Sequence, residues 1–337
     1  MTRVLLVEPG PDFSVADVSN GWKAGLEANG CDVKVFPMGH WVAWMSAASQ
    51  AIDDPDTTDH QAAQLVQPML RGAALDWWPD LVVVVSGFYV SGETLNILRA
   101  RRMPVAVIFT ESPYEDDDQA HLAAFADLAI VNDPTNLDLF RQHNPNTHWM
   151  PHAWDPRVHR RQVVGKDYRS DVCFVGSGFP SRIETLEAVD WRGIDFALAG
   201  HWFGLTDDSP LRQYLAHPID CCCPNDEAAK LYSGTKLGLN IYRREAQRPE
   251  LSQGWAMGPR EVELAAIGVP FITEPRGENR ERFPYLPTFD DPVDLSEKLR
   301  WWPGHDIERQ ALARRLQAAV ADQTFDEHAR RLLAAVL

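Results

Sequence analysis

The sequence has few cysteines, no long apolar run and little positive charge. Five cysteines occur in 337 residues, and three of them are consecutive. This pattern contains no disulfide framework, and a reducing cytoplasm is the simplest compartment for such a chain. No stretch approaches the roughly eighteen apolar residues of a membrane-spanning helix. The amino-terminal MTRVLLVEPGPD has only a short apolar run before Glu8, which predicts a strand and not a signal peptide.

Lysine and arginine together number 32 against 48 acidic residues, which gives a net charge of −16. The electric field of this net negative charge repels nucleic acid and anionic membranes at long range, although it does not exclude a local basic groove. The dense basic stretch RVHRRQVVGKDYR at 157–169 is interpreted as a solvated linker. Apolar residues at 45% and charged residues at 24% are typical of a globular protein, and the length suits two domains.

A strand–helix rhythm organises the first half of the chain and predicts a parallel sheet. Strands are predicted at residues 3–7, 32–36, 81–85, 105–109, 128–131 and 147–150. Helices are predicted at about 14–28, 59–77, 91–101, 117–125 and 135–142. The turn-rich PGPDFS at 9–14 is a predicted loop. Residues 37–60 interrupt the rhythm and are expected to form a long loop with an apolar pair, Trp41 and Trp44.

The rhythm restarts after the extended PHAWDP segment at 151–156. Further strands are predicted at 171–175, 196–200, 236–242, 269–273 and 288–289, and the last helices at about 293–302, 306–320 and 324–337. We therefore predict an α/β fold with two doubly wound, Rossmann-like domains. The predicted boundaries are a first domain at 1–152, a linker at 153–168, a second domain at 169–320 and a carboxy-terminal helix at 321–337.

One helix start in the second domain has the features of an anion site. Gly258 and Pro259 precede a short helix, and Gly268 is a natural residue to end it. Free N–H groups at such a helix start favour an anion, and Arg260 adds a guanidinium that can grip phosphate oxygens. Glu263, one turn further on, would repel a phosphate but could accept hydrogen bonds from a ribose diol. The alternative is an ordinary helix–strand unit with surface charges.

A second helix start follows Gly176, Ser177 and Gly178, whose backbone N–H groups can approach an anion closely. Ser181 is a predicted cap for a helix that begins at Arg182. The spacing is not that of a P-loop, because Gly-Lys-Ser/Thr is missing. Two such sites in one parallel domain, each with an arginine in its first turn, suggest a diphosphate ligand.

Three stretches give the chain a resemblance to a known family. REVELAAIGVPFITEP (260–275), SDVCFVGSGFPSRIETLEAV (170–189) and LYSGTKLGLNIYRRE (231–245) are similar to segments of GT-B glycosyltransferases of the group-1 and CgeB-like set. The resemblance covers most of the carboxy-terminal half and, loosely, the other half. It implies the GT-B fold with an interdomain cleft, and a final helix that crosses back to the first domain. It also implies transfer of a sugar from a nucleotide-diphosphate sugar, expected to be a UDP-sugar.

The resemblance also implies which residues bind the donor. Arg182 and Arg260 would hold the leaving diphosphate, and Lys236 would lie near the phosphates. The expected donor-binding set is Gly176, Ser177, Gly178, Lys236, Asn240, Tyr242, Arg243, Gly258 and Glu263. The chain departs from the family pattern at one point. Many group-1 members carry two glutamates that lie eight positions apart. Glu263 matches the second of them, but the first falls on Trp255.

No metal cofactor is expected, because two helix ends and two arginines can neutralise a leaving diphosphate. The acidic EDDD run at 115–118 is interpreted as a solvated helix start, where the dipole favours negative charge. Cys221, Cys222 and Cys223 are interpreted as the end of a strand made of small residues, because no CxxC spacing exists.

The stereochemistry decides whether a catalytic base is needed. An inverting enzyme must deprotonate the acceptor hydroxyl, and Glu111 is the first candidate for this base, with Asp133 and His152 behind it. These residues follow predicted strands of the first domain, where ligands of open parallel sheets bind. A retaining enzyme needs no such base, and the resemblance favours retention.

Other functions stay open at this point. The chain could bind a sugar or a nucleotide sugar without turnover, as a CgeB-like structural protein, or act as a nucleotide-sugar epimerase. The acceptor could be a small molecule, a polysaccharide or a hydroxymethylated base in DNA. The net charge of −16 counts against DNA, whereas the basic residues 157–169 favour it. The sequence leaves the sugar, the acceptor and the oligomeric state undecided.

Overall fold

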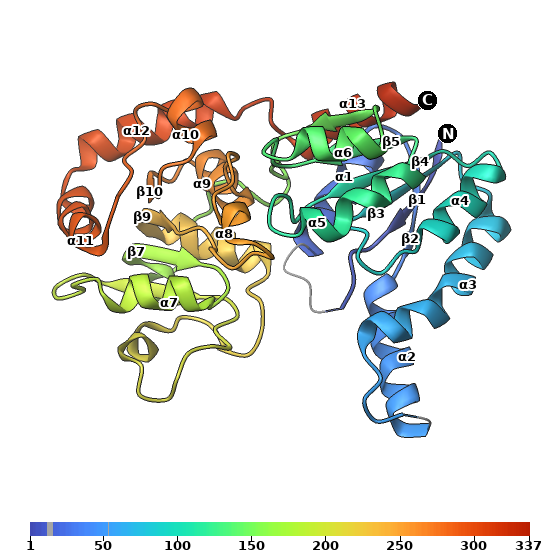
Figure 1. Cartoon of the computed structure of the whole chain (residues 1–337). Coiled ribbons are helices and arrows are strands. Elements are labelled where there is room, and N and C mark those ends of the chain that lie inside the picture. The colour runs from blue at the N-terminus through green and yellow to red at the C-terminus, as the bar shows by residue number, and fades with distance from the viewer. Residues whose placement is uncertain (12–15, 53) are drawn as a thin grey trace. The chain divides into compact units, whose positions relative to one another are not determined.

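The computed structural model describes residues 1–11, 16–52 and 54–337, apart from the side chain of Ala16. The predicted loop residues 12–14, the predicted helix start at 14–15 and residue 53 lie outside the described part of the chain. The chain divides into two compact units, one made of 1–151 with 325–337 and the other of 152–324. Figure 1 shows the elements of each unit.

The first unit contains a six-stranded parallel sheet with the order β2-β1-β3-β4-β5-β6. Its strands are β1 (Arg3–Val7), β2 (Asp32–Phe36), β3 (Leu81–Val85), β4 (Val105–Phe109), β5 (Leu128–Val131) and β6 (Thr147–Trp149). Its helices are α1 (Ala16–Ala28), α2 (Met38–Ile52), α3 (Asp59–Trp77), α4 (Gly92–Ala100), α5 (Asp116–Gln119), a 3-10 turn (Ala120–Phe125), α6 (Leu137–His143) and α13 (Phe325–Val336). The predicted parallel sheet is confirmed.

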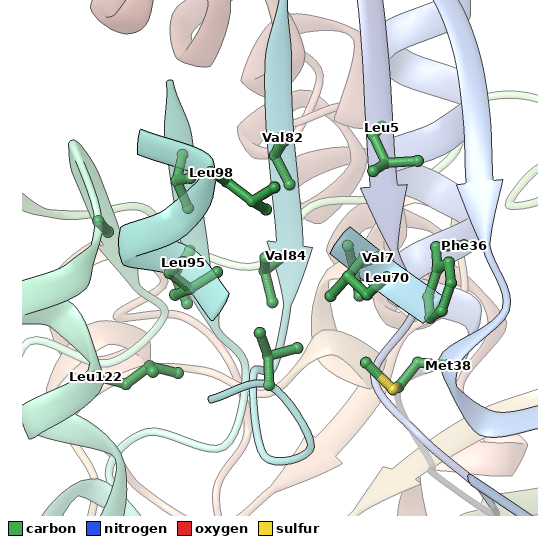
Figure 2. Close-up of a cluster of buried hydrophobic side chains, with 14 of the residues drawn as sticks. Leu5, Val7, Phe36, Met38, Leu70, Val82, Val84, Leu95, Leu98 and Leu122 are labelled. Carbon is green, nitrogen blue, oxygen red and sulfur yellow. The ribbon is translucent and has the colours of Figure 1, made fainter. Parts of the chain in front are cut away.

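Apolar strands hold the first unit together. Every residue of β3 and of β4 is buried, as expected for central strands of a parallel sheet covered by helices on both faces. Figure 2 shows strand side chains such as Val7 and Val84 in one buried cluster with the helix side chains Leu70 and Leu95. Burial of one such side chain stabilises the fold by about 1.5–3 kcal/mol.

The prediction of a long loop at 37–60 is wrong, because most of this segment is the helix α2. Met38, Val42 and Ser46 recur every four residues and form the buried stripe of the helix. The segment contains no charged side chain between positions 38 and 52. Trp41 packs against the core of the first unit. The Trp44 ring makes an edge contact with the Trp41 ring, with 6.4 Å between their centroids.

The last helix, α13, packs on α1 within the first unit. Phe325 makes an edge contact with Trp22, and His328 Nε2 lies 2.9 Å from the carbonyl oxygen of Pro151. The helices approach closely because α1 carries Gly25, where an added Cβ would lie 2.3 Å from the carbonyl oxygen of Phe325. A larger residue at position 25 would therefore push α13 away from α1.

The second unit contains a four-stranded parallel sheet with the order β10-β9-β7-β8. Its strands are β7 (Ser170–Val175), β8 (Phe196–Ala199), β9 (Thr235–Asn240) and β10 (Phe271–Thr273). Its helices are α7 (Pro180–Glu187), α8 (Asn225–Gly234), α9 (Pro259–Ile267), α10 (Gly277–Arg282), α11 (Pro292–Trp301) and α12 (Asp306–Ala319). Its 3-10 turns are Lys166–Tyr168, Pro210–Tyr214, Pro249–Ser252 and Trp302–Gly304.

Three local features of the second unit differ from what the sequence suggested. Residues 153–168 are grouped with this unit, where the Trp154 indole donates to the carbonyl oxygen of Val320 at 2.7 Å. The helix α10 was not predicted. The interpretation of residues 221–223 as a strand end is wrong, because they are irregular backbone before α8.

Within the described ranges, the structure contains no helix that is both long enough and apolar enough to span a membrane.

Candidate functional site

The candidate donor site lies at the carboxyl edge of the sheet in the second unit. β7 pairs with β8 on one side and with β9 on the other, so the direction of winding reverses between β7 and β9. Ligands of open parallel sheets bind at such a reversal, beyond the carboxyl ends of the strands. Gly176–Gly178 follows β7 and Ile241–Arg243 follows β9, so the structure brings these two predicted segments to one edge.

Arg182 joins the ends of β7 and β9. Its Nε donates to the carbonyl oxygen of Ile241 at 2.8 Å, and its Nη1 donates to that of Ser177 at 3.1 Å. The guanidinium also lies 5.3 Å from the centroid of the Phe179 ring. Arg182 therefore positions the glycine loop, and a contact with a diphosphate would have to use its other N–H groups.

The glycine loop itself packs tightly. A Cβ added to Gly178 would lie 2.8 Å from the Cα of Trp202, whose side chain is fully buried. Glycine at this position is thus explained by the approach of the loop to Trp202. Packing against Trp202 therefore accounts for the glycine at position 178 without the predicted contact with an anion.

The helix after the glycine loop begins earlier than predicted. α7 starts at Pro180 with Phe179 as its N-cap, so the prediction that Ser181 caps a helix beginning at Arg182 is wrong. The Ser181 backbone N–H and hydroxyl donate to the two carboxylate oxygens of Glu245 at 2.9 and 3.1 Å.

An internal carboxylate therefore takes the anion position at the start of α7. Partial burial raises the pKa of Glu245, but the hydrogen bonds from Ser181 outweigh it, and the net pKa lies below the usual range. Glu245 belongs to the segment 243–257, which connects β9 to α9. A diphosphate bound at the start of α7 would have to displace Glu245.

The start of α9 is held by a buried network. Gly258 is the N-cap, and its backbone N–H donates to Glu261 Oε2 at 2.7 Å. The Tyr242 hydroxyl donates to the same oxygen at 2.5 Å, and the Arg276 guanidinium lies 3.6 Å from the Tyr242 ring centroid. The predicted donor residues Tyr242 and Gly258 are therefore linked through Glu261, which was not predicted. Burial raises the pKa of Glu261 to about 7.

Glu261 should give the protein a pH-dependent stability. Between its ordinary pKa and about 7, the unfolded chain releases the proton while the folded chain keeps it. The free energy of unfolding is therefore expected to fall by about 3 kcal/mol as the pH rises from about 4.5 to 7. Urea denaturation across this range measures the effect, with Glu261→Gln as the variant that lacks the titration. A constant difference between wild type and Glu261→Gln would contradict a raised pKa.

Arg260 and Glu263 form a pair at the predicted phosphate and ribose positions. Arg260 Nη1 donates to Glu263 Oε2 at 2.5 Å and lies 3.2 Å from Asn225 Oδ1. The guanidinium also lies over the Tyr232 ring, 5.7 Å from its centroid. The Glu263 side chain is only 8% exposed. The structure thus brings the two residues together, and contacts with Asn225 and Tyr232 help to position Arg260.

His159 is a site residue that sequence reasoning missed. Its Nδ1 accepts the backbone N–H of Asp155 at 2.9 Å, which leaves the proton on Nε2. Nε2 lies 3.7 Å from Glu263 Oε1 and has no hydrogen-bond partner among the described residues. Burial lowers the pKa of His159, so the ring is neutral at pH 7. The basic stretch 157–169 was interpreted as a solvated linker, which is wrong for His159, whose side chain is 3% exposed.

The structure does not bring Lys236 to this edge. Lys236 is the second residue of β9, at the amino end of the strand, and its Nζ lies 2.7 Å from Asp171 Oδ1. Four residues of extended strand, about 13 Å, separate it from Asn240 at the carboxyl end. Asn240 is buried and donates through Nδ2 to Thr273 Oγ1 at 3.1 Å, which ties β9 to β10. The Arg243 guanidinium lies near the Phe179 ring, beside the glycine loop.

Trp255 occupies the position that the family resemblance assigned to a first glutamate. Its carbonyl oxygen accepts the backbone N–H of Glu278 at 2.8 Å, and its indole covers Gly277 at the start of α10. The buried Glu278 carboxylate accepts the backbone N–H of Met257 at 2.7 Å and pairs with Arg282. Glu278 therefore anchors the segment that leads into α9.

In the first unit, polar side chains gather beyond β4 and β5. Ser112 Oγ and Asn136 Nδ2 lie 3.0 and 2.9 Å from Asp116 Oδ2. Asp116 is fully buried, and burial raises its pKa to about 6. The interpretation of 115–118 as a solvated helix start is therefore wrong for Asp116, although the next two aspartates are exposed.

The three predicted catalytic bases differ in their surroundings. Glu111 is half-buried after β4. Asp133 is buried, and its Oδ1 accepts the backbone N–H of Thr135 at 2.8 Å, so its carboxylate closes a turn. His152 belongs to the second unit, where its carbonyl oxygen accepts Gln323 Nε2 at 2.6 Å. Glu111 thus remains the first candidate for a base in the first unit.

The described residues include no group of three or more His, Cys, Asp or Glu side chains that could hold a metal ion. Cys173 and Cys223 are buried, whereas Cys221 and Cys222 are exposed. The cysteines therefore form no metal site in the described part of the chain.

The chain is similar in sequence and in fold to known proteins. The family described as glycosyl transferase-like matches residues 182–334. The spore protein CgeB of Bacillus subtilis (strain 168) is 24% identical over 257 residues, which is 74% of this chain and 80% of that protein.

Solved structures show the same fold over the whole chain. Sucrose-phosphate synthase from Thermosynechococcus elongatus has a TM-score of 0.66 at 13% identity and covers 99% of this chain and 100% of its own. Anabaena Alr3699/HepE, solved in complex with UDP-glucose, has a TM-score of 0.65 at 12% identity and covers 100% of both chains. The two parallel α/β units have the GT-B fold, the segment from α7 to α13 is similar to glycosyl transferase-like proteins, and 74% of the chain is similar to CgeB.

Proposed function

We propose that the chain transfers a sugar from a UDP-sugar to an acceptor hydroxyl, with retention and without a divalent metal. The observation that carries this proposal is the Arg260–Glu263 pair at the start of α9. A guanidinium for phosphate oxygens and a buried carboxylate for a ribose diol lie side by side. The complex of the similar Anabaena HepE with UDP-glucose supports UDP as the nucleotide.

The chemistry needs positive charge where the glycosidic bond breaks. The bond between the anomeric carbon and the diphosphate oxygen breaks, and the diphosphate leaves with added negative charge. The acceptor oxygen bonds to the anomeric carbon, and its proton passes to the departing diphosphate oxygen. Arg260 and the N–H groups at the start of α9 would stabilise the leaving diphosphate. Retention rests on the resemblance to group-1 glycosyltransferases, and Glu111 would serve as the base if the reaction were inverting.

The proposal is tested by donor binding and turnover. We expect a UDP-sugar at a hundred times its Kd to stabilise the protein by about 2.7 kcal/mol, seen as a rise in Tm. A panel of UDP-, GDP- and ADP-sugars gives the comparison, and release of UDP measures turnover. EDTA should leave the rate unchanged. No response to any nucleotide sugar contradicts the proposal, and loss of rate with EDTA, rescued by Mn²⁺ or Mg²⁺, contradicts its metal independence.

A second candidate function is binding without turnover. It is favoured by the similarity to CgeB, which is described as a spore protein. A donor that raises Tm but gives no release of UDP and no labelled product with any acceptor would support this candidate.

A hydroxymethylated base in DNA is a further candidate acceptor. The sequence feature that favours DNA as the acceptor is the basic stretch 157–169. Within it, Arg157 pairs with Asp155 at 2.6 Å and His159 is buried, so these two side chains are not available to bind phosphates of DNA. DNA binding that weakens steeply with salt would favour this acceptor.

A further inference from the structure

A basic pocket opens in the second unit at the amino edge of its sheet, where β9 and β10 begin. The pocket has a volume of about 330 Å³, at the small end of the range for ligand sites. Its walls are α12, the start of β9, the turn from α9 to β10 and the segment before β7. The charged side chains that line it are Arg161, Lys236, Arg309 and Arg314, and no acidic side chain is among its lining residues in the described chain.

Two of these cations are neutralised and two are not. Lys236 pairs with Asp171, and Arg309 pairs with Asp306. Arg161 donates only to the carbonyl oxygen of Gly268, at 3.4 Å, and has no acidic partner in the described part of the chain. Arg314 has neither an ion pair nor a hydrogen bond with any described residue. The pocket therefore has about two surplus positive charges, in a chain whose net charge is −16.

Arg161 and Arg314, which carry the surplus charge, are both exposed to solvent and line the same pocket. Neighbouring atoms partly shield the Arg161 guanidinium from water, which lowers its pKa, and the nearby charge of Arg309 lowers it further. The carbonyl end of α9 also faces the pocket and would disfavour an anion. Two carbonyl oxygens at that end of α9 already accept hydrogen bonds. Gln317 Nε2 donates to the carbonyl oxygen of Ala266 at 3.0 Å, and Arg161 donates to that of Gly268.

We propose that this pocket binds a phosphate group, as orthophosphate or as a small phosphomonoester. A phosphate dianion would match the two surplus charges, and the guanidinium groups of Arg161 and Arg314 can each grip its oxygens in a fork. The pocket is distinct from the donor site, because Gly268 ends α9 at the pocket while Arg260 lies in the first turn of α9. Nine helical residues separate the two ends by about 13 Å.

Calorimetric titration of the full chain with inorganic phosphate and with glucose 6-phosphate tests this proposal. Arg161→Ala and Arg314→Ala are each expected to weaken phosphate binding by at least about tenfold, because each removes a charged donor. Arg315→Ala is the matched control on the same helix, since Arg315 stacks on Tyr285 instead of lining the pocket. The control should bind phosphate like the wild type. Tighter binding of glucose 6-phosphate than of phosphate identifies a phosphomonoester as the ligand, and equal binding identifies the phosphate group alone.

The outcome also separates this pocket from the donor site. Glu263→Gln should bind phosphate like the wild type, because Glu263 is not among the residues that line the pocket and carries no positive charge. The proposal is overturned if the wild type binds neither probe, or if Arg315→Ala loses binding as Arg314→Ala does. It is also overturned if Glu263→Gln loses binding while Arg314→Ala retains it, which would place the phosphate at the donor site. These results do not depend on whether the chain turns over a nucleotide sugar.

Discussion

Replacing Arg260 with alanine is expected to lower kcat for donor turnover by about 10²–10³, the usual effect of losing one electrostatic donor. The negative charge on the diphosphate grows as the glycosidic bond breaks, so the guanidinium should stabilise the transition state more than the bound donor. KM should therefore change less than kcat. The measurement is the initial rate of UDP release from a UDP-sugar that raises Tm.

Two comparisons make the Arg260 result specific. Arg260→Lys should recover only part of the rate, because an ammonium group cannot bind two oxygens in a fork. Arg315→Ala removes the same charge elsewhere in the second unit and should keep the normal rate. Because Arg260 pairs with the buried Glu263, circular dichroism must show that each variant is folded. A folded Arg260→Ala with near-normal kcat would place the phosphate site elsewhere.

Glu263→Gln is expected to weaken binding of UDP and UDP-sugars by about 1.5–3 kcal/mol, the scale of hydrogen bonds to a charged group. The carboxylate is held by Arg260 on one oxygen and faces His159 Nε2 on the other, so its position is well defined. The amide keeps the shape but not the charge. Calorimetric titration with UDP measures the change directly.

The control for this prediction is Glu297→Gln on α11, an exposed glutamate in the same unit. It should bind UDP like the wild type and have the same Tm. If the folded Glu263→Gln also binds UDP normally, the role of Glu263 is to hold Arg260 and not to bind ribose. In that case Glu263→Gln should still lower kcat, because Arg260 would lose its partner.

Local sequence signals were sufficient for much of the fold. The apolar runs of β1 and β3 are each followed by turn residues, and the ends of both strands match the predicted ones. Gly268 ends α9 with a φ of 77°, the left-handed conformation expected of it. Arg260 and Glu263 face each other because residues three positions apart share one side of a helix. In each case the deciding interactions lie within one element or its flanking turn.

The tertiary structure decided how the site is supported. Glu245 reaches Ser181 across 64 positions of sequence, and His159 reaches Glu263 across a still longer separation. No periodicity in the sequence reports such contacts, because each depends on where the sheet places two distant segments. Asp116 is buried for the same reason. The sequence therefore determined which side chains are candidates for binding a nucleotide sugar. The packing of distant segments decided which of these side chains lie at the carboxyl edge of the second sheet and which, like Lys236, lie at its amino edge.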